Sequence, residues 1–189
     1  MTDFVFVTGN QKKADYLARW LDHPVEHQKV DLDELQSLDL REVITHKAQE
    51  AYRQLGRTVL VEDVSLVINA FGGLPGTFIK YFLEEMGPKG IVKMLHSFDD
   101  RSVSAKIAYG LYDGNELHIF EGQTDGMIAP EPRVSEHDGW HGTLSWNSIF
   151  VPNGSDKTYA EMTDEELQPV SHRAKAIAEL QEYLTLVDN

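Results

Sequence analysis

The stretch Phe4-Val5-Phe6-Val7-Thr8-Gly9-Asn10-Gln11-Lys12-Lys13 decides the fold. Its first four residues are apolar and predict a short buried strand, and Thr8-Gly9-Asn10 is typical of a turn. A helix is expected next, because apolar side chains recur at helical spacing at Ala14, Leu17, Ala18 and Leu21. A buried strand, a turn and an amphipathic helix in this order indicate an α/β protein.

The rest of the chain continues this alternation and then changes. The pattern predicts helices over 40–55, 79–86, 88–96 and 171–186, and strands over 58–61, 102–112, 116–128 and 149–151. The first of these strands is expected to end at Glu62-Asp63, and loops are expected over 72–76 and 129–143. Asp113-Gly114-Asn115 is a hairpin signal between the two long strands. The prediction is one α/β domain over residues 1–189, with a mixed sheet, flanking helices and a long hairpin lobe.

Composition narrows the class of function. The 189 residues include 31 acidic and 17 basic side chains and no cysteine, and the net charge is −14. That charge argues against nucleic-acid binding, which needs a cationic surface, and the absence of cysteine excludes disulfides and thiolate chemistry. No apolar run reaches the roughly 18 residues of a membrane span, and the first residues lack the pattern of a signal peptide. The expectation is a cytoplasmic protein without a membrane partner.

Polar residues follow the two early strands at the points where each is expected to end. Ligands of open α/β sheets bind beyond the carboxyl ends of the strands, so Thr8, Asn10, Glu62 and Asp63 are expected to converge on one crevice. Carboxylates suit a hard cation, and Glu34 is a third candidate besides Glu62 and Asp63. A solvated acidic surface is the alternative for Glu34.

Three lysines are candidates for binding an anion. Lys12 and Lys13 lie in the first turn of the first predicted helix, where exposed N–H groups favour negative charge. Lys47 shares a helix face with Val43 and Ala51, so its ammonium needs an anion or must reach solvent. An ordinary capped helix with surface lysines is the alternative for the first pair.

Arg173 is placed unusually on the last helix. Ser171 stands where a helix N-cap is expected, so Arg173 falls in the first turn, where the helix dipole opposes a cation. Such a placement favours a role in binding a ligand.

Several motifs together resemble one family, the inosine triphosphate pyrophosphatases. They are Thr8-Gly9-Asn10-Gln11-Lys12-Lys13, Val61-Glu62-Asp63-Val64-Ser65-Leu66, Gly72-Gly73-Leu74-Pro75-Gly76, Ile149-Phe150-Val151-Pro152, Tyr159-Ala160-Glu161-Met162 and Ser171-His172-Arg173. The resemblance covers essentially the whole chain. It implies an elongated mixed sheet in two lobes around a central cleft, a homodimer, and Mg²⁺-dependent hydrolysis of ITP, dITP and XTP to the monophosphate and pyrophosphate.

The resemblance also implies roles for individual residues. Thr8, Gly9, Asn10, Lys12, Lys13 and Lys47 would hold the triphosphate, with Lys13 and Lys47 also acting in catalysis. Glu34, Glu62 and Asp63 would hold the metal, and Asp63 would activate water. Trp146, Asn147, Ser171, His172 and Arg173 would contact the base.

Two positions depart from the family pattern. Leu144-Ser145-Trp146-Asn147-Ser148 replaces Phe-Gly-Trp-Asp-Pro, and Leu167 stands where the family has a lysine. An altered base preference is therefore one alternative. A pyrophosphatase of the Maf type acting on modified nucleotides and a nucleotide sensor without hydrolysis are the others.

Overall fold

The computed structural model describes residues 3–21, 25–135 and 145–187. The chain divides into two compact units, which are described separately. Unit 1 comprises residues 1–63, 107–122 and 175–189, and unit 2 comprises residues 64–106 and 123–174.

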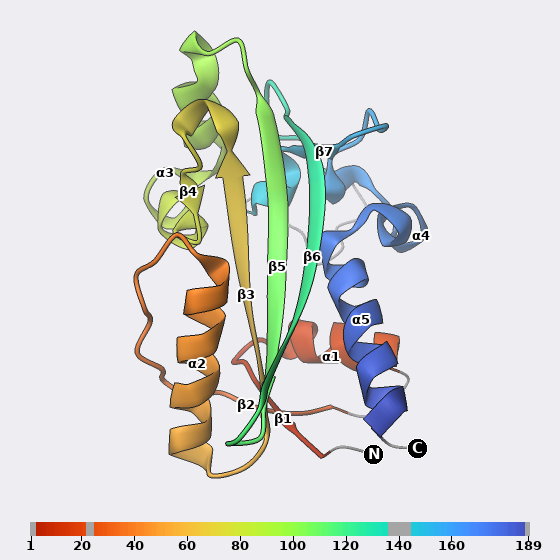
Figure 1. Cartoon of the computed structure of the whole chain (residues 1–189). Coiled ribbons are helices and arrows are strands. Elements are labelled where there is room, and N and C mark those ends of the chain that lie inside the picture. Colours follow the sequence, from red (N-terminus) through yellow and green to blue (C-terminus); the bar gives the residue numbers. More distant parts are fainter. Residues whose placement is uncertain (1–2, 22–24, 136–144, 188–189) are drawn as a thin grey trace. The chain divides into compact units, whose positions relative to one another are not determined.

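One mixed sheet supplies the strands of both units (Figure 1). Its order is β2-β1-β3-β5-β6-β7, and β4 pairs with β3 outside this path. The three long strands each contribute residues to both units. The strands are β1 (Val5–Val7), β2 (Glu26–Gln28), β3 (Val59–Ile68), β4 (Pro75–Gly76), β5 (Ser102–Tyr112), β6 (Leu117–Ile128) and β7 (Phe150–Pro152).

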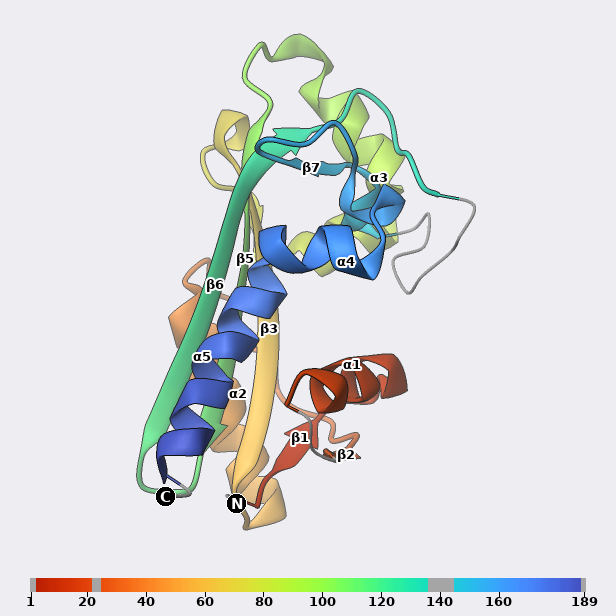
Figure 2. The same ribbon diagram turned by 90° about the vertical axis from the view of Figure 1, so that its right-hand side faces the viewer.

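In unit 1 the strands β2 and β3 lie on either side of β1, and one helix precedes each of them. The chain passes through α1 (Gln11–Leu21) to β2 on one side of β1, then through α2 (Leu40–Leu55) to β3 on the other side. All three strands are parallel, and right-handed crossovers in opposite directions place the two helices on opposite faces of the sheet (Figure 2). The carboxyl end of β1 is therefore the switch point at which open α/β sheets bind ligands.

Local sequence fixes the ends of α2. Asp39 accepts hydrogen bonds from the N–H groups of Arg41 and Glu42, and Gly56 ends the helix in the left-handed conformation with φ +65°. Its apolar face joins the unit 1 core, whose fully buried members include Val5, Ile44, Ala48, Val59 and Val61.

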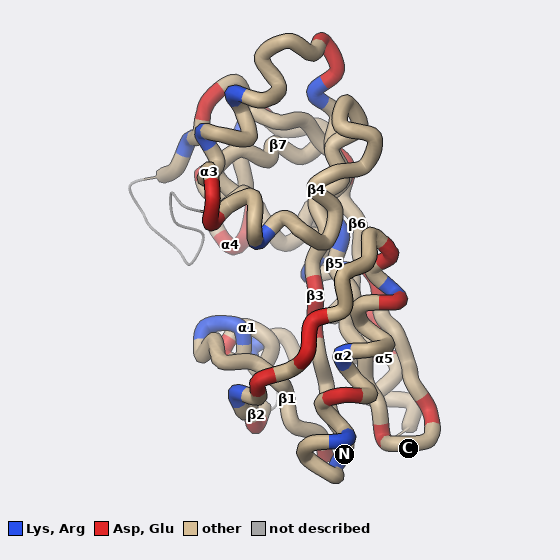
Figure 3. The backbone as a smooth tube through the Cα atoms, turned by 90° about the vertical axis from the view of Figure 1, so that its left-hand side faces the viewer, with Lys and Arg blue, Asp and Glu red and all other residues tan. Residues whose placement is uncertain are grey.

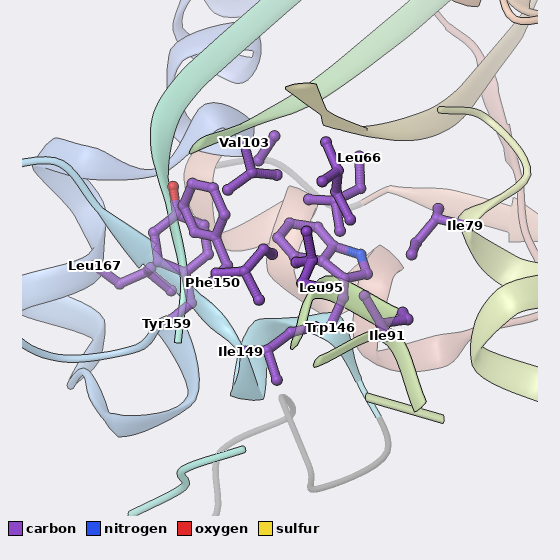
Figure 4. Close-up of a cluster of buried hydrophobic side chains, with 13 residues drawn as sticks. Leu66, Ile79, Ile91, Leu95, Val103, Trp146, Ile149, Phe150, Tyr159 and Leu167 are labelled. Carbon is purple, nitrogen blue, oxygen red and sulfur yellow. The ribbon is translucent and has the colours of Figure 1, made fainter. Parts of the chain in front are cut away.

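Unit 2 has a core of its own, shown in Figure 4, which includes Leu66, Ile91, Val103, Trp146, Phe150, Tyr159 and Leu167. Its helix α3 (Ile79–Met94) is broken at Gly87, whose φ of +66° is not helical. Two helices were expected over these residues, so the expected break is confirmed. The short α4 (Asp164–Leu167) begins at a capping box of Thr163 and Glu166, and α5 (His172–Val187) starts in unit 2 and continues in unit 1.

Most predicted elements are confirmed, including α2 over 40–55 and β5 over 102–112. The expectation that the second strand ends at Glu62-Asp63 is wrong, since β3 runs on to Ile68. Beyond the two acids, Leu66 and Ile68 are fully buried in the unit 2 core and Leu66 pairs with β4, which keeps the strand extended.

Three shorter elements differ from the expectation. Pro75–Gly76 is a strand rather than loop, and β2 and α4 were not predicted. Part of the loop expected over 129–143 lies outside the described residues. Within the described residues, no helix has the length and apolar character of a membrane span.

Candidate functional site

The turn after β1 is built by side chains that bind backbone N–H groups. Thr8 Oγ1 accepts from Asn10 N–H at 3.1 Å, and Asn10 Oδ1 accepts from Lys12 N–H at 3.0 Å. Asn10 thereby caps α1, whose axis starts at the switch point of the sheet. Lys12 and Lys13 thus lie in the first turn of a capped helix, as the sequence predicted.

Glu62 and Asp63 lie on β3 beyond the level at which β1 ends. The ladder pairs Val5 with Val59 and Phe6 with Leu60. Because successive strand residues face opposite sides of a sheet, the two carboxylates turn to different helices. Glu62, with only 4% of its side chain exposed, lies 2.5 Å from Lys13 Nζ of α1. Figure 3 marks the acidic stretch of β3 and the basic first turn of α1.

Lys47 reaches the same part of β3 from α2. Its Nζ donates to Asp63 Oδ2 at 2.9 Å and to the Glu62 carbonyl at 3.1 Å. The Thr58 carbonyl accepts from the N–H of Val5 on β1. Every second carbonyl of a strand points to the same edge, so the Glu62 carbonyl also faces the β1 side, but past the last residue of β1. The Lys47 ammonium is therefore bound by a carboxylate and by a backbone carbonyl that lies past the end of β1.

These contacts bring four of the expected residues together in unit 1, as two lysine–carboxylate pairs. The Lys47 and Asp63 side chains are 21% and 24% exposed, so a ligand has access to both. Glu34 lies on the exposed segment between β2 and α2. Over residues 3–21, 25–135 and 145–187, no three His, Asp or Glu side chains form a group that holds a metal ion.

Sequence reasoning missed Lys29, which follows β2 directly. Thr8 N–H donates to the Gln28 carbonyl at 3.0 Å, so Lys29 stands beside the turn at the end of β1. A methyl group on the Gly9 α-carbon would lie 3.0 Å from Lys29 Cδ and 3.1 Å from Lys29 Cγ. The polar residues of β2 concealed the strand, and with it the position of Lys29.

The other expected residues gather in unit 2 around an aromatic cluster. Trp146 is 7% exposed and contacts the rings of Phe150, Tyr159 and His172 at centroid distances of 5.7, 6.2 and 5.4 Å. The buried His172 ring is parallel to Tyr159 at 5.9 Å, with an interplanar angle of 3°. Tyr159, whose hydroxyl donates to the Val170 carbonyl at 2.8 Å, holds the start of α5 in place. Its motif was recognised in the sequence, but not this supporting role.

Ser171 and Arg173 are placed as expected at the start of α5. Ser171 Oγ accepts from Ala174 N–H at 3.3 Å, which confirms the N-cap, and Arg173 is half-buried in the first turn. Asn147 is half-buried in a short 3-10 helix, where its N–H donates to Ser145 Oγ. Leu167 is 6% exposed and belongs to the unit 2 core (Figure 4).

Comparison with known proteins gives one consistent result. Residues 4–183 match the Ham1 family. An inosine triphosphate pyrophosphatase from Kluyveromyces lactis is 39% identical over 96% of this chain and 95% of its own. A protein of the same name from Schizosaccharomyces pombe is 38% identical over 97% and 96%.

Solved structures agree with the sequence comparison. A HAM1 protein from Coxiella burnetii is 25% identical, with a TM-score of 0.82 over 98% of this chain and 99% of its own. A nucleoside-triphosphatase described as a dITP/XTP pyrophosphatase, from Mycobacterium abscessus, is 26% identical, with a TM-score of 0.73 over 94% and 97%.

Proposed function

The chain belongs to the Ham1 family, and on that premise we propose that it hydrolyses ITP, dITP and XTP to the monophosphate and pyrophosphate. The observation that carries the proposal is the pair of lysine–carboxylate contacts at the switch point of the sheet, in a chain 39% identical to an inosine triphosphate pyrophosphatase. Removal of deaminated purine nucleotides from the nucleotide pool is the role that follows.

The reaction adds water across the bond between the α- and β-phosphates. A water oxygen forms a bond to the α-phosphorus, the bond from that phosphorus to the bridging oxygen breaks, and pyrophosphate leaves. The transition state places negative charge on oxygens, so positioned cations are the main source of rate enhancement. Lys13 and Lys47 would supply such cations, and the capped turn of Thr8, Gly9 and Asn10 with Lys12 would bind the phosphates.

Asp63 is the proposed general base. Its carboxylate is bound to Lys47 at 2.9 Å and remains one-quarter exposed. A phosphate group that attracts the Lys47 ammonium would leave Asp63 to accept the proton of the attacking water. The carboxylate and the cation it needs are thus already adjacent before substrate binds.

Mg²⁺ is the proposed metal, and the residues present suit it in kind. Mg²⁺ takes oxygen ligands and usually needs only one or two protein carboxylates, with substrate phosphates and waters completing its shell. Glu62 and Asp63, with Glu34, would hold it, and when bound it would neutralise phosphate charge.

Trp146, Asn147, Ser171, His172 and Arg173 are proposed to contact the base. The amide of Asn147 offers both a donor and an acceptor, whereas a carboxylate only accepts. Leu167 offers neither, because its side chain is a hydrocarbon, and it is packed in the core. Discrimination against 6-amino purines is therefore expected to be weaker than in relatives that carry a carboxylate and an ammonium at these positions.

Further expectations from the sequence remain part of the proposal. Residues 1–189 are taken as one nucleoside triphosphate pyrophosphatase domain, because β3, β5 and β6 each supply both units. A homodimer in the cytoplasm, without nucleic-acid or membrane partners, is proposed on the resemblance and on the net charge of −14.

The test is a screen of purified protein with Mg²⁺ against a panel of purine and pyrimidine nucleoside triphosphates, with pyrophosphate and monophosphate both measured. The proposal expects ITP, dITP and XTP to give the highest kcat/KM. Preference for a modified pyrimidine nucleotide would favour the Maf-type alternative. Tight binding with no hydrolysis of any triphosphate would favour the sensor.

A further inference from the structure

The lysines at the switch point of unit 1 differ in whether they form an ion pair with a carboxylate. Lys13 and Lys47 are each bound to a carboxylate, at 2.5 and 2.9 Å. Lys12 and Lys29 are exposed, and neither forms an ion pair with any carboxylate in the described part of the chain. Exposed Lys93 also forms none within the described residues, so what distinguishes Lys12 and Lys29 is their place beside the turn after β1.

The charge of a bound triphosphate can be compared with the charge of the residues at this site. Each bound pair, Lys13–Glu62 and Lys47–Asp63, sums to zero, whereas a triphosphate brings about four negative charges. One divalent cation neutralises about half of that charge. Lys12 and Lys29 would supply two of the positive charges that are still needed.

The position of Lys29 agrees with this role. The aliphatic part of its side chain passes beside Gly9, with Cδ and Cγ 3.0 and 3.1 Å from the point at which a Cβ on Gly9 would stand. Nζ is only two bonds beyond Cδ, so the ammonium stays beside the turn of residues 8–10. The φ of Gly9 lies outside the left-handed region, so backbone conformation does not require glycine there. A methyl group there would make the Lys29 side chain move by a few tenths of an ångström.

We infer that Lys29 is a further phosphate-binding residue of this site and that Gly9 is present to let its side chain lie along the turn. The inference rests on the proposed function for its substrate, because the phosphates are those of a nucleoside triphosphate. Lys29 acts in binding, and its removal should raise KM with little change in kcat.

The experiment measures the dissociation constant for inorganic tripolyphosphate without divalent metal, and KM and kcat for ITP with Mg²⁺. Lys29→Met keeps most of the aliphatic side chain and removes the charge. It should raise the dissociation constant for tripolyphosphate and the KM for ITP, each about tenfold. Lys29→Arg should bind within about threefold of wild type. Lys93→Met on α3, in unit 2, is the matched control for the change in net charge and should bind as wild type does.

A double-mutant cycle tests the part assigned to Gly9. Gly9→Ala should weaken tripolyphosphate binding several-fold in the wild-type background and have little effect once Lys29 is Met, because the methyl group acts by displacing the Lys29 side chain. Equal and additive losses would overturn the role of Gly9.

The outcomes separate this inference from the proposed function. If Lys29→Met binds tripolyphosphate as tightly as Lys93→Met, or if the wild-type protein does not bind it, the inference is wrong. If the wild-type protein hydrolyses no nucleoside triphosphate, the proposed function fails, while the tripolyphosphate measurement still reports on Lys29.

Discussion

The substitution Asp63→Asn is expected to lower the catalytic rate while leaving the stability of the protein nearly unchanged. The amide oxygen of asparagine can still accept from Lys47, so the contact at 2.9 Å survives in neutral form. A partly exposed ion pair contributes up to about 1 kcal/mol, which corresponds to a shift of roughly 2–4 °C in Tm for a chain of this length. Loss of a general base should lower kcat at least about a hundredfold, or about 2.7 kcal/mol in the barrier.

The assay follows pyrophosphate release from ITP at saturating Mg²⁺, alongside a thermal melt of the same preparation. Asp125→Asn provides the matched control, since Asp125 is also a strand aspartate that accepts hydrogen bonds, from Ser104 and Gln123 in unit 2. The control should keep its kcat. A folded Asp63→Asn protein with the wild-type kcat would show that Asp63 does not activate water.

Four further changes test other parts of the reasoning. Lys47→Met should raise KM for ITP at least about tenfold while lowering Tm by no more than roughly 4 °C; an unchanged KM in a titration would leave Lys47 a purely structural role. Asn147→Asp should raise the ratio of kcat/KM for ITP over ATP about tenfold, and a ratio that does not rise would refute the altered base preference. Leu167→Lys places an ammonium in the unit 2 core and should cost several kcal/mol of unfolding free energy in denaturant melts; wild-type stability would mean that the side chain escapes the core. Backbone N–H groups across the hairpin turn hold the pKa of Asp113 below its ordinary value, so its stabilising contribution is present above that ordinary value and is lost as pH falls through the folded-state pKa; Asp113→Asn should flatten the acid side of the stability profile, and parallel profiles would falsify this.

Where apolar periodicity was strong, the sequence was a sufficient guide to the fold. The sixteen residues of α2 and the eleven of β5 lie where the pattern placed them, because both have an apolar face, and α2 also has clear end signals at Asp39 and Gly56. Periodicity failed for β2, whose Glu-His-Gln sequence is polar because the strand is at the sheet edge. It also failed at Glu62-Asp63, where charge within a strand was interpreted as its end.

The sequence predicted which residues belong to the candidate site, but not which lysine pairs with which carboxylate. Motif order placed Lys13, Lys47, Glu62 and Asp63 near the switch point, but the matching of each lysine to one carboxylate depends on the pleat of β3, which spacing alone does not reveal. Lys29 was missed because its proximity to Gly9 depends on the pairing of β2 with β1, a contact between segments about twenty residues apart.

The stretch of β3 between its pairing with β1 and its pairing with β4 also bears on how copies of this chain behave in concentrated solution. A strand edge with unoccupied backbone acceptors can pair with the edge of another molecule, and lysine at such an edge is a common defence against aggregation. The Lys47 ammonium already occupies the Glu62 carbonyl there, so no incoming strand can take that acceptor without displacing a charge. A neutral residue at position 47 should therefore leave the protein more prone to self-association, which a measurement of activity alone would not reveal.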